Sequence, residues 1–278
     1  KRNLDNKDIT SPGSAISAGG FSKELVSDYI APMVSAIWST PDSMTTELPF
    51  SEFVTFFENH GLLTFHNRPK WNTVRGGSKS YISSFLKSFA GKVVYSPVKS
   101  IRRNPGEVIT EGGSYAFDKV ILATHADISH KLLQDITPEE DALLGAWKYH
   151  ANLAILHTDK CILPPKKSAW ASWNYLRTEN SLPVNVTYYM NLLQSLGANN
   201  DYFISLNAEH LIRQEHILYK KIYHHPHYDC DAPSRQRSLL QLSGRNNTAF
   251  CGSYLGYGFH EDAFATGKAA AKTLLELK

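Results

Sequence analysis

The sequence has few cysteines and no long apolar run. These two features argue against a disulfide-rich protein and against a membrane-spanning one. Three cysteines occur among 278 residues, Cys161, Cys230 and Cys251, odd in number and far apart. A disulfide framework needs paired cysteines, so we expect free thiols and a reducing compartment, the cytoplasm. The longest apolar runs, such as residues 120–123, are too short to cross a bilayer, and the sequence shows no signal-peptide pattern. We therefore expect no membrane span.

The sequence also lacks a large excess of either positive or negative charge. The chain has 29 Lys and Arg against 26 Asp and Glu, and its longest basic runs are pairs such as Lys166-Lys167. Because nucleic-acid-binding proteins gather basic residues into a patch or stripe, we do not expect nucleic acid as a partner. With 42% apolar residues, the chain can bury one large core or two modest ones.

Several catalytic motifs are missing. The sequence contains no Gly-x-Ser-x-Gly nucleophile elbow, no Gly-x-x-x-x-Gly-Lys phosphate loop, no Cys-x-x-Cys pair and no His-Glu-x-x-His. These absences argue against the corresponding hydrolases, nucleoside triphosphatases, dithiol enzymes and zinc proteases. No internal repeat or long linker is present, so we expect interleaved parts rather than domains in series.

Apolar periodicity predicts the helices. Residues 21–38 form a helical stripe interrupted by Pro32, and a second helix is expected over 52–60. Gly76-Gly77 precedes aromatic residues at intervals of four, which predicts a tight turn feeding an amphipathic helix that ends at Gly91. A capping-box signature at residues 137–140 starts another helix, and small residues line the inner face of the last one.

Segments in which apolar residues recur at a period of about two predict two sheets. A meander is expected from residues 92–95, 98–102, 107–110 and 115–117, with turns at 104–106 and 112–113. Residues 120–123 are typical of a strand covered on both faces. A second, aromatic sheet is expected from residues 150–157, 169–175, 184–190 and 202–207, and a last strand from 248–251.

The most informative segment, residues 250–263, runs from a strand through a glycine-rich loop into a helix. Glycines let the backbone approach a flat ligand, and the free N–H groups of a helix start carry positive partial charge. Gly256-x-Gly258 begins a dinucleotide pattern, but Glu261 stands where the third glycine belongs, so we expect no phosphate site. Alternatively, the glycines only make a turn and Glu261-Asp262 cap the last helix.

This segment resembles the C-terminal flavin motif of the FAD-dependent amine oxidase superfamily, and in particular its branch of predicted NAD/FAD-binding proteins. That branch ends much like residues 256–262, Gly-Tyr-Gly-Phe-His-Glu-Asp. Further similarity lies, in the right order, at residues 36–39 (AIWS), 71–78 (WNTVRGGS), 156–159 (LHTD) and 172–175 (SWNY). The resemblance implies an α/β fold, α+β in this chain, with an incomplete FAD/NAD(P)-binding domain, a β-meander and a mixed-sheet substrate domain with helices.

The resemblance also implies site residues. The paired glycines at 76 and 77 should pass near the flavin, the backbone of Val98 should pair with the adenine edge, and residues 260–263 should lie under flavin N1 and O2. A helix-entry turn and a plain buried valine are the alternatives at the first two places. The implied cofactor-binding residues are Gly76, Gly77, Ser78, Val98, Ala123, Thr124, Gly252, Ser253, Gly258, His260, Glu261, Asp262 and Ala263.

The implied activity is oxidation of a C–N or C–C bond in a small or lipid-like molecule by hydride transfer to flavin N5. Hydride transfer places negative charge at N1 and O2, where preorganised N–H groups stabilise it. Tyr254, Tyr257 and Phe259 are expected to form an aromatic wall for the substrate, unless they are ordinary core aromatics. Trp173 is a further candidate; Trp170, three residues away, should face the other side of its strand. No catalytic side chain is assigned.

Two departures limit the resemblance. Ser253 stands where the superfamily usually has an acidic residue at the ribityl chain. Relatives also open with a strand, a Gly-x-Gly-x-x-Gly turn and an acidic residue about 20 positions later, and this sequence, which begins at Lys1 without Met, has none of these. We therefore expect a truncated chain that holds FAD poorly or not at all. The alternative function is a non-catalytic binding or structural module that keeps the fold without cofactor.

The expected substrate domain comprises residues 1–64 and 137–230, and the remainder of the FAD domain comprises 65–136 and 231–278. Metal-ligand side chains occur close together over residues 224–231, but the surrounding polar residues favour a solvated loop, and no metal site is assigned. His125 and His157 are candidates for proton transfer, with a strand-end histidine held by the backbone as the favoured alternative. Neither substrate identity nor oligomeric state follows from the sequence.

Overall fold

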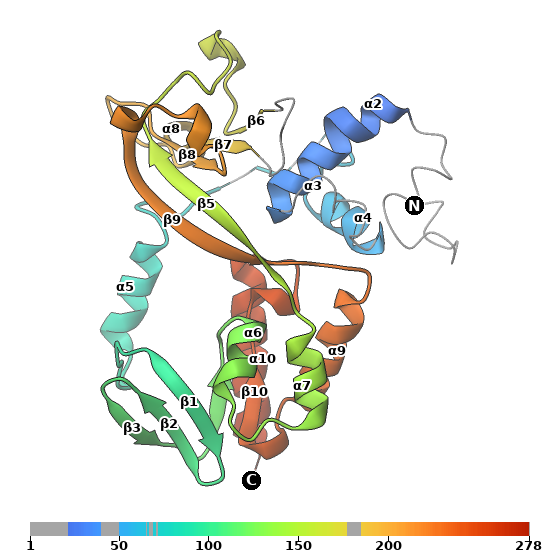
Figure 1. Cartoon of the computed structure of the whole chain (residues 1–278), viewed down its shortest axis with the longest axis vertical. Coiled ribbons are helices and arrows are strands. Elements are labelled where there is room, and N and C mark those ends of the chain that lie inside the picture. The colour runs from blue at the N-terminus through green and yellow to red at the C-terminus, as the bar shows by residue number, and fades with distance from the viewer. Residues whose placement is uncertain are drawn as a thin grey trace. The chain divides into compact units, whose positions relative to one another are not determined.

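The computed structural model describes residues 22–39, 50–64, 66, 69, 70, 72–176 and 185–277. Contacts divide the chain into two compact units, the first made of Lys1–Gly91 and His150–His225 and the second of Lys92–Tyr149 and Pro226–Lys278. Both units combine helices with sheets, so the predicted mixed α+β class is confirmed (Figure 1). Compactness does not say what a unit binds, and the assignment of substrate and FAD domains stays a prediction.

The first unit begins with helices. A short α2 (Lys23–Leu25), a π-helical turn η1 (Val26–Ile30) and α3 (Ala31–Trp38) follow one another, and α4 is Phe50–Asn59. Pro32 is the second residue of α3 and follows the π-helical turn directly, and the backbone stays helical on both sides of the junction. Both predicted helices are therefore confirmed from Lys23 onward; Phe21 of the first stripe and Trp71 of the glycine motif lie outside the described residues.

The third predicted helix, α5 (Lys79–Ser88), follows the turn at Gly76-Gly77 as expected and ends before Gly91. It has the predicted amphipathic pattern, but its aromatic side chains are exposed, Phe85 to 58% and Tyr81 to 48%. No residue of α5 is buried within the part of the chain that the structure describes. An isolated helix of this length is marginal in water, so the apolar face of α5 is a surface suited to packing.

A five-stranded sheet forms the rest of the first unit, in the order β6-β7-β8-β5-β9. Its strands are β5 (Tyr149–His157), β6 (Trp173–Tyr175), β7 (Val186–Tyr189), β8 (Phe203–Leu206) and β9 (Ile217–Pro226). The four predicted strands of this sheet are confirmed, although β6 begins later than expected. Shorter turns lie between them: η3 (Lys167–Ala169), α8 (Met190–Leu193), η4 (Glu209–Leu211) and η5 (Gln214–His216). Ile155 and Phe203, both 0% exposed, centre its core.

The strand β9 corrects the sequence analysis, which interpreted the histidine-containing segment from residue 224 as a solvated loop. His224 and His225 lie in this strand. Its apolar and charged residues do not alternate and most of its side chains are exposed, so the strand depends on pairing with β5 rather than on burial of one face. Among the described residues, no three His, Cys, Asp or Glu side chains are placed to hold a metal ion.

A buried polar chain crosses the centre of this sheet. The Nδ1 atom of His157 accepts the N–H of Asp159 at 3.1 Å, and its Nε2 lies 2.8 Å from Ser205 Oγ. His157 is 0% exposed, and burial lowers the pKa of its ring to about 4. Asp159, also buried, accepts hydrogen bonds from the guanidinium of Arg213, which hold its pKa far below the usual range. His157 is therefore a strand-end histidine fixed by backbone and hydroxyl partners.

The second unit contains the predicted meander and a parallel pair of strands. The antiparallel strands β1 (Val98–Arg103), β2 (Gly106–Thr110) and β3 (Gly113–Ala116) are confirmed. The strand predicted over residues 92–95 is wrong: this segment is irregular, and Tyr95 is 89% exposed. Its apolar residues have strand propensity, but a strand also needs a neighbour, and the sheets of the described ranges include none for it.

The parallel pair joins β4 (Val120–Leu122) to β10 (Thr248–Phe250). Helices α6 (Ala126–Leu132), α7 (Pro138–Gly145), α9 (Ala232–Leu242) and α10 (His260–Glu276) belong to the same unit, with short turns η6 (Arg245–Asn247) and η7 (Ser253–Leu255). Ala270 and Leu274 of α10 pack on Ala249 and Cys251, as the small inner face predicted. The helix α10 lies beside β10 (Figure 1). β4 was predicted to be covered on both faces, but Leu122 is 2% exposed and Ile121 38%, so the described residues cover one face only.

Cys161, Cys230 and Cys251 form no disulfide, as predicted. None of the helices within the described ranges combines the length and apolar composition that a bilayer crossing requires.

An ion cluster joins the meander of the second unit to α7. The guanidinium of Arg103 donates to both oxygens of Glu140 at 2.6 and 2.9 Å and to Asp135 at 3.0 Å. Glu140 also completes the predicted capping box by accepting the N–H of Thr137 at 2.9 Å. Burial alone would raise the pKa of Glu140, but these hydrogen bonds outweigh it and lower the pKa.

We predict that Arg103→Met destabilises the protein by about 3 kcal/mol, because it leaves a buried carboxylate without its partner. The Arg103 and Glu140 side chains are 3% and 4% exposed. The matched control is Arg102→Met, since the neighbouring Arg102 is 46% exposed and pairs with Glu107 at the surface. That change should cost under about 1 kcal/mol. Urea unfolding measures both, and equal losses would contradict the account.

Burial of neutral His157 predicts a pH dependence of stability. The folded-state pKa of about 4 lies below the ordinary value of 6.5, so the unfolded chain binds the proton more tightly. Stability should therefore fall by about 3 kcal/mol as the pH drops from 6.5 to about 4. Unfolding free energies measured across the window should lose this slope in His157→Gln. An NMR titration in which the wild-type His157 ring protonates near its ordinary pKa would contradict the prediction.

Candidate functional site

The parallel pairing of β4 with β10 brings two distant segments to one edge of the second unit. Val120, Ile121 and Leu122 lie opposite Thr248, Ala249 and Phe250. Residues 123–125 and 251–259 therefore leave the two strands at the same end. Ala123, Thr124 and His125 are exposed there, and a Cβ on Gly252 would lie 3.8 Å from the Thr124 carbonyl oxygen. In open α/β sheets, ligands bind outside the carboxyl ends of parallel strands.

The loop over residues 251–259 has a tightly defined backbone. The carbonyl oxygen of Ser253 accepts the N–H groups of Gly256 and Gly258, both at 3.1 Å. Gly258 has a φ of +100°, and a Cβ there would lie 3.0 Å from Tyr228 Oη. A Cβ on Gly256 would lie 2.4 Å from Asp262 Oδ1. Both glycines are thus required by the packing of the loop itself.

The start of α10 leaves three backbone donors open. Asp262 caps the helix by accepting the N–H of Phe259 at 2.9 Å, and Ala263 N–H donates to the Phe259 carbonyl. Within the described ranges, no group accepts the N–H of His260, Glu261 or Asp262. His260 and Glu261 are exposed, so this helix end faces solvent. A helix of 17 residues carries about half a positive charge at such an end.

The predicted aromatic wall divides into a buried and a surface part. Tyr257 and Phe259 are half-buried, but Tyr254 is only 2% exposed. Its ring packs edge-on against Trp147, with centroids 5.4 Å apart, and burial raises the pKa of its phenol well above the usual value. No described residue supplies a hydrogen-bond partner for the Tyr254 hydroxyl. An unpaired buried hydroxyl costs about 1–3 kcal/mol, so its presence beside this loop suits a polar partner that the described residues do not supply.

His125 is held at the same edge. Its ring stacks on that of Tyr149, with centroids 4.5 Å apart and planes 12° from parallel. Tyr149 Oη accepts the N–H of Ala126 at 2.9 Å, and the His125 carbonyl accepts the N–H of Ser129 at 2.8 Å. His125 therefore keeps an exposed imidazole in a fixed orientation beside the loop, and proton transfer by this ring stays a prediction.

The remaining predicted residues belong to other elements. Gly76 and Gly77 form the turn before α5 in the first unit, with φ of +79° and +77°, and Ser78 follows them. Trp173 is half-buried in β6 of the same unit, edge-on to Tyr188. Val98 begins β1 opposite Thr110 and is 39% exposed. The second unit thus brings together residues 123, 124, 252, 253 and 257–263 of the predicted set.

Residues that hold the loop were not found from the sequence. Thr266 Oγ accepts the N–H of Gly252 at 3.1 Å, and the side-chain amide of Gln236 donates to two loop carbonyls. Each is a single polar residue on an amphipathic helix, and nothing in their spacing distinguishes them from surface residues. Only the folded backbone identifies them.

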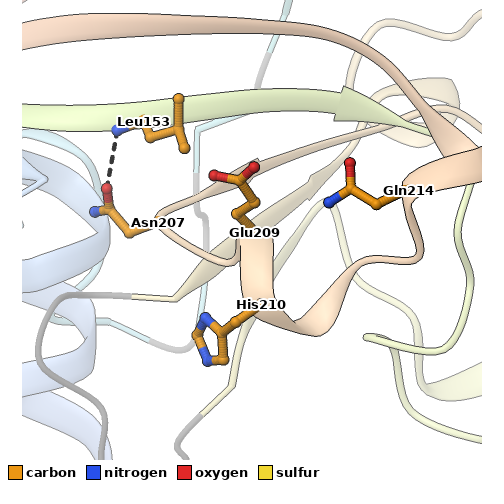
Figure 2. Close-up of a pocket in the computed structure, with 5 residues that line it drawn as sticks. All are labelled: Leu153, Asn207, Glu209, His210 and Gln214. Atoms are coloured by element: carbon orange, nitrogen blue, oxygen red, sulfur yellow. Dashed lines mark hydrogen bonds between the residues drawn. The ribbon is translucent and has the colours of Figure 1, made fainter.

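The first unit contains a separate pocket that the sequence did not indicate. It has a volume of about 490 Å³ and is lined by Leu153, Asn207, Glu209, His210 and Gln214. Figure 2 shows that Glu209 and His210, adjacent in sequence, point to opposite sides of their turn. Asn207 Oδ1 accepts the Leu153 N–H at 2.9 Å (Figure 2). The polar residues between β8 and β9 carried no motif from which this pocket could be inferred.

Comparison with known proteins identifies the fold. No family model and no curated protein matches the chain in sequence. Among solved structures, a CLA-producing fatty acid isomerase from P. acnes is similar with a TM-score of 0.66 and 12% identity, covering 99% of this chain and 69% of the isomerase. Cyclohexylamine oxidase from Brevibacterium oxydans IH-35A has a TM-score of 0.63 and 11% identity, with 97% and 68% covered. Reduced UDP-galactopyranose mutase has a TM-score of 0.58 and 11% identity, with 91% and 64% covered.

These similarities have two consequences. The chain shares its fold with these enzymes, which include an amine oxidase, whereas identities this low carry no specific activity. The chain also spans only 64–69% of the length of these three structures.

Proposed function

We propose that this chain forms the flavin-facing and substrate-binding part of an FAD-dependent oxidoreductase of the amine-oxidase type. The observation that carries the proposal is the open start of α10, whose N–H groups at residues 260–262 lie beside the carboxyl ends of two parallel strands. Its support is the shared fold with an amine oxidase. Oxidation of a C–N or C–C bond is the reaction class that this combination favours.

The residues of this edge suit a flavin ring. The N–H groups of His260, Glu261 and Asp262 would face N1 and O2, and the backbone of exposed Ala123 and Thr124 and of half-buried Gly252 and Ser253 would lie along the ribityl side. Asp262 directs one carboxylate oxygen back to Phe259, which leaves the helix amides free for an external acceptor. When bound, the flavin supplies the hydride acceptor. The helix amides supply preorganised positive charge where the reduced ring is electron-rich.

The proposed substrate is small or lipid-like. Tyr257 and Phe259 are half-buried beside the loop, and the Phe264 side chain on the first turns of α10 is 67% exposed. Two of the structurally similar proteins are, by their names, enzymes of an alicyclic amine and of a fatty acid. Partly exposed aromatic rings beside the positive end of a helix dipole suit such an apolar carbon skeleton.

The proposal includes an assignment of domains and a location. Residues 1–64 and 137–230 form the substrate domain, and residues 65–136 and 231–278 form the part of the FAD domain present in this chain. The proposed location is the cytoplasm.

We further infer that the adenosine diphosphate half of FAD is held by residues outside this sequence. The chain has no Gly-x-Gly-x-x-Gly turn between a strand and a helix, and about a third of each structurally similar protein is not covered by this chain. The competing function is a non-catalytic module that keeps the fold without cofactor. One observation favours it: the loop glycines at 256 and 258 are already required by contacts with Asp262 and Tyr228.

A flavin titration separates the two functions. We predict that this chain quenches riboflavin fluorescence saturably but weakly, and FAD no more strongly than riboflavin, because it contacts the ring and not the nucleotide half. Protein purified from its natural source should be yellow and carry FAD. A natural protein that is colourless and ignores added FAD would support the module and exclude the oxidoreductase.

We predict that Gly258→Val lowers flavin affinity at least tenfold, since Gly258 has a left-handed backbone at the exposed bend before α10. The control is Gly113→Val in the meander, where φ is +142° and no atom lies within 4 Å of a Cβ. That substitution carries a similar backbone strain away from the loop. Flavin titrations at matched folded fractions measure both, and normal affinity in the Gly258 variant would show that the loop is misplaced.

A further inference from the structure

One side chain beneath the loop joins two of its peptide groups. Gln236 lies on α9, is half-buried, and its Nε2 donates to the carbonyl oxygens of Tyr254 at 2.9 Å and Gly256 at 2.8 Å. Both N–H bonds of one planar amide are thereby used on carbonyls two residues apart. A side chain that satisfies two loop carbonyls from a helix fixes the loop more tightly than either bond alone, because no further rotamer freedom is lost for the second bond.

Thr266 and Asp262 of α10 hold the two ends of this loop by accepting the N–H groups of Gly252 at 3.1 Å and Phe259 at 2.9 Å. Tyr228 Oη donates a hydrogen bond to Ser253 O at 3.4 Å, and the N–H groups of Gly256 and Gly258 donate to the same carbonyl oxygen. These bonds fix the beginning of the loop. Beyond it, Gln236 determines the orientation of the Gly256 peptide plane, which immediately precedes the bend into α10.

The orientation of that plane has a direct consequence. In a trans peptide the N–H of the following residue points opposite to the carbonyl, so turning the Gly256 carbonyl toward Gln236 turns the Tyr257 N–H away from α9. The chain then passes through the left-handed Gly258 to the exposed amides of His260 and Glu261. Gln236 thus sets the direction in which the open donors of α10 are presented.

We propose that Gln236 is a positioning residue for the flavin site: it acts through the loop, and makes no contact with the ligand. The inference rests on the proposed function, because presentation of these amides matters for a flavin only if the flavin lies there. It names a residue on α9, outside the glycine motif, as a determinant of flavin affinity.

Gln236→Met tests the loop without any ligand, because it keeps the side-chain length and removes both donors. Hydrogen exchange of the Gly256 and Gly258 amides should become about tenfold faster, while the interior amides of α9 keep wild-type rates. The matched control is Gln241→Met, the same substitution at an exposed position of the same helix. Wild-type exchange of the loop amides in Gln236→Met would overturn the proposal.

Gln236→Glu adds a readout that a general loss of stability does not move. A carboxylate at this position faces two carbonyl oxygens, whereas a protonated carboxyl donates to one of them. Riboflavin affinity should be about tenfold below wild type at neutral pH and should recover as the pH is lowered. Asp262 also lies beside Gly256, but it is present in both proteins, so the difference between them reports on position 236.

The outcomes separate this inference from the proposed function. Binding by wild type together with a weakened, acid-rescued Gln236→Glu supports the positioning role. Equal affinity of wild type and both Gln236 variants overturns it and leaves the flavin site standing. If wild type binds neither riboflavin nor FAD and the natural protein is colourless, the proposed function fails, and the positioning role fails with it.

Discussion

The hydrogen-bonded pairing of β4 with β10 is the constraint on which the site depends. These are short strands from distant parts of the chain, and their parallel register places the exposed residues 123–125 beside Gly252. An antiparallel or slipped pairing would send the two following segments to opposite ends or turn Leu122 outward. Packing of Ala270 and Leu274 on Ala249 and Cys251 then fixes the axis of α10 against this pair. The open helix end is therefore a consequence of strand register and close helix packing.

Given that register, the loop chemistry follows from local geometry. Gly258 bends the chain, Gln236 and Ser253 hold its peptide groups, and Asp262 caps one amide while no described group accepts the next three. The acid at the helix start and the open donors do not conflict, since the Asp262 carboxylate bonds to the preceding residue. Such a terminus offers partial positive charge without a mobile side chain, which is the kind of preorganisation that stabilises a developing anion.

Much of the fold was predictable because its signals are local. The capping box at Thr137, the turn at Gly76-Gly77, the meander and the small inner face of α10 all follow from neighbouring residues. The errors arose where long-range contacts decide. The strand β9 forms only by pairing with β5, and residues 92–95 remain irregular without a neighbouring strand. Tyr254, for which the sequence left an aromatic wall and an ordinary core position both open, is buried against Trp147, because the turn η7 directs it inward. The role of Gln236 could not be predicted from the sequence, because nothing in the residues around a helical glutamine indicates which loop its side chain will contact.

The central claim is that the amides at the start of α10 face a flavin ring, and backbone NMR tests it most directly. Riboflavin added to the isotopically labelled chain should shift the amide resonances of His260, Glu261 and Asp262 downfield in a saturable manner, with smaller changes at Thr124 and Gly252. If those three resonances stay fixed at saturating riboflavin while shifts gather in another part of the chain, the flavin is not at this helix end and the account is wrong.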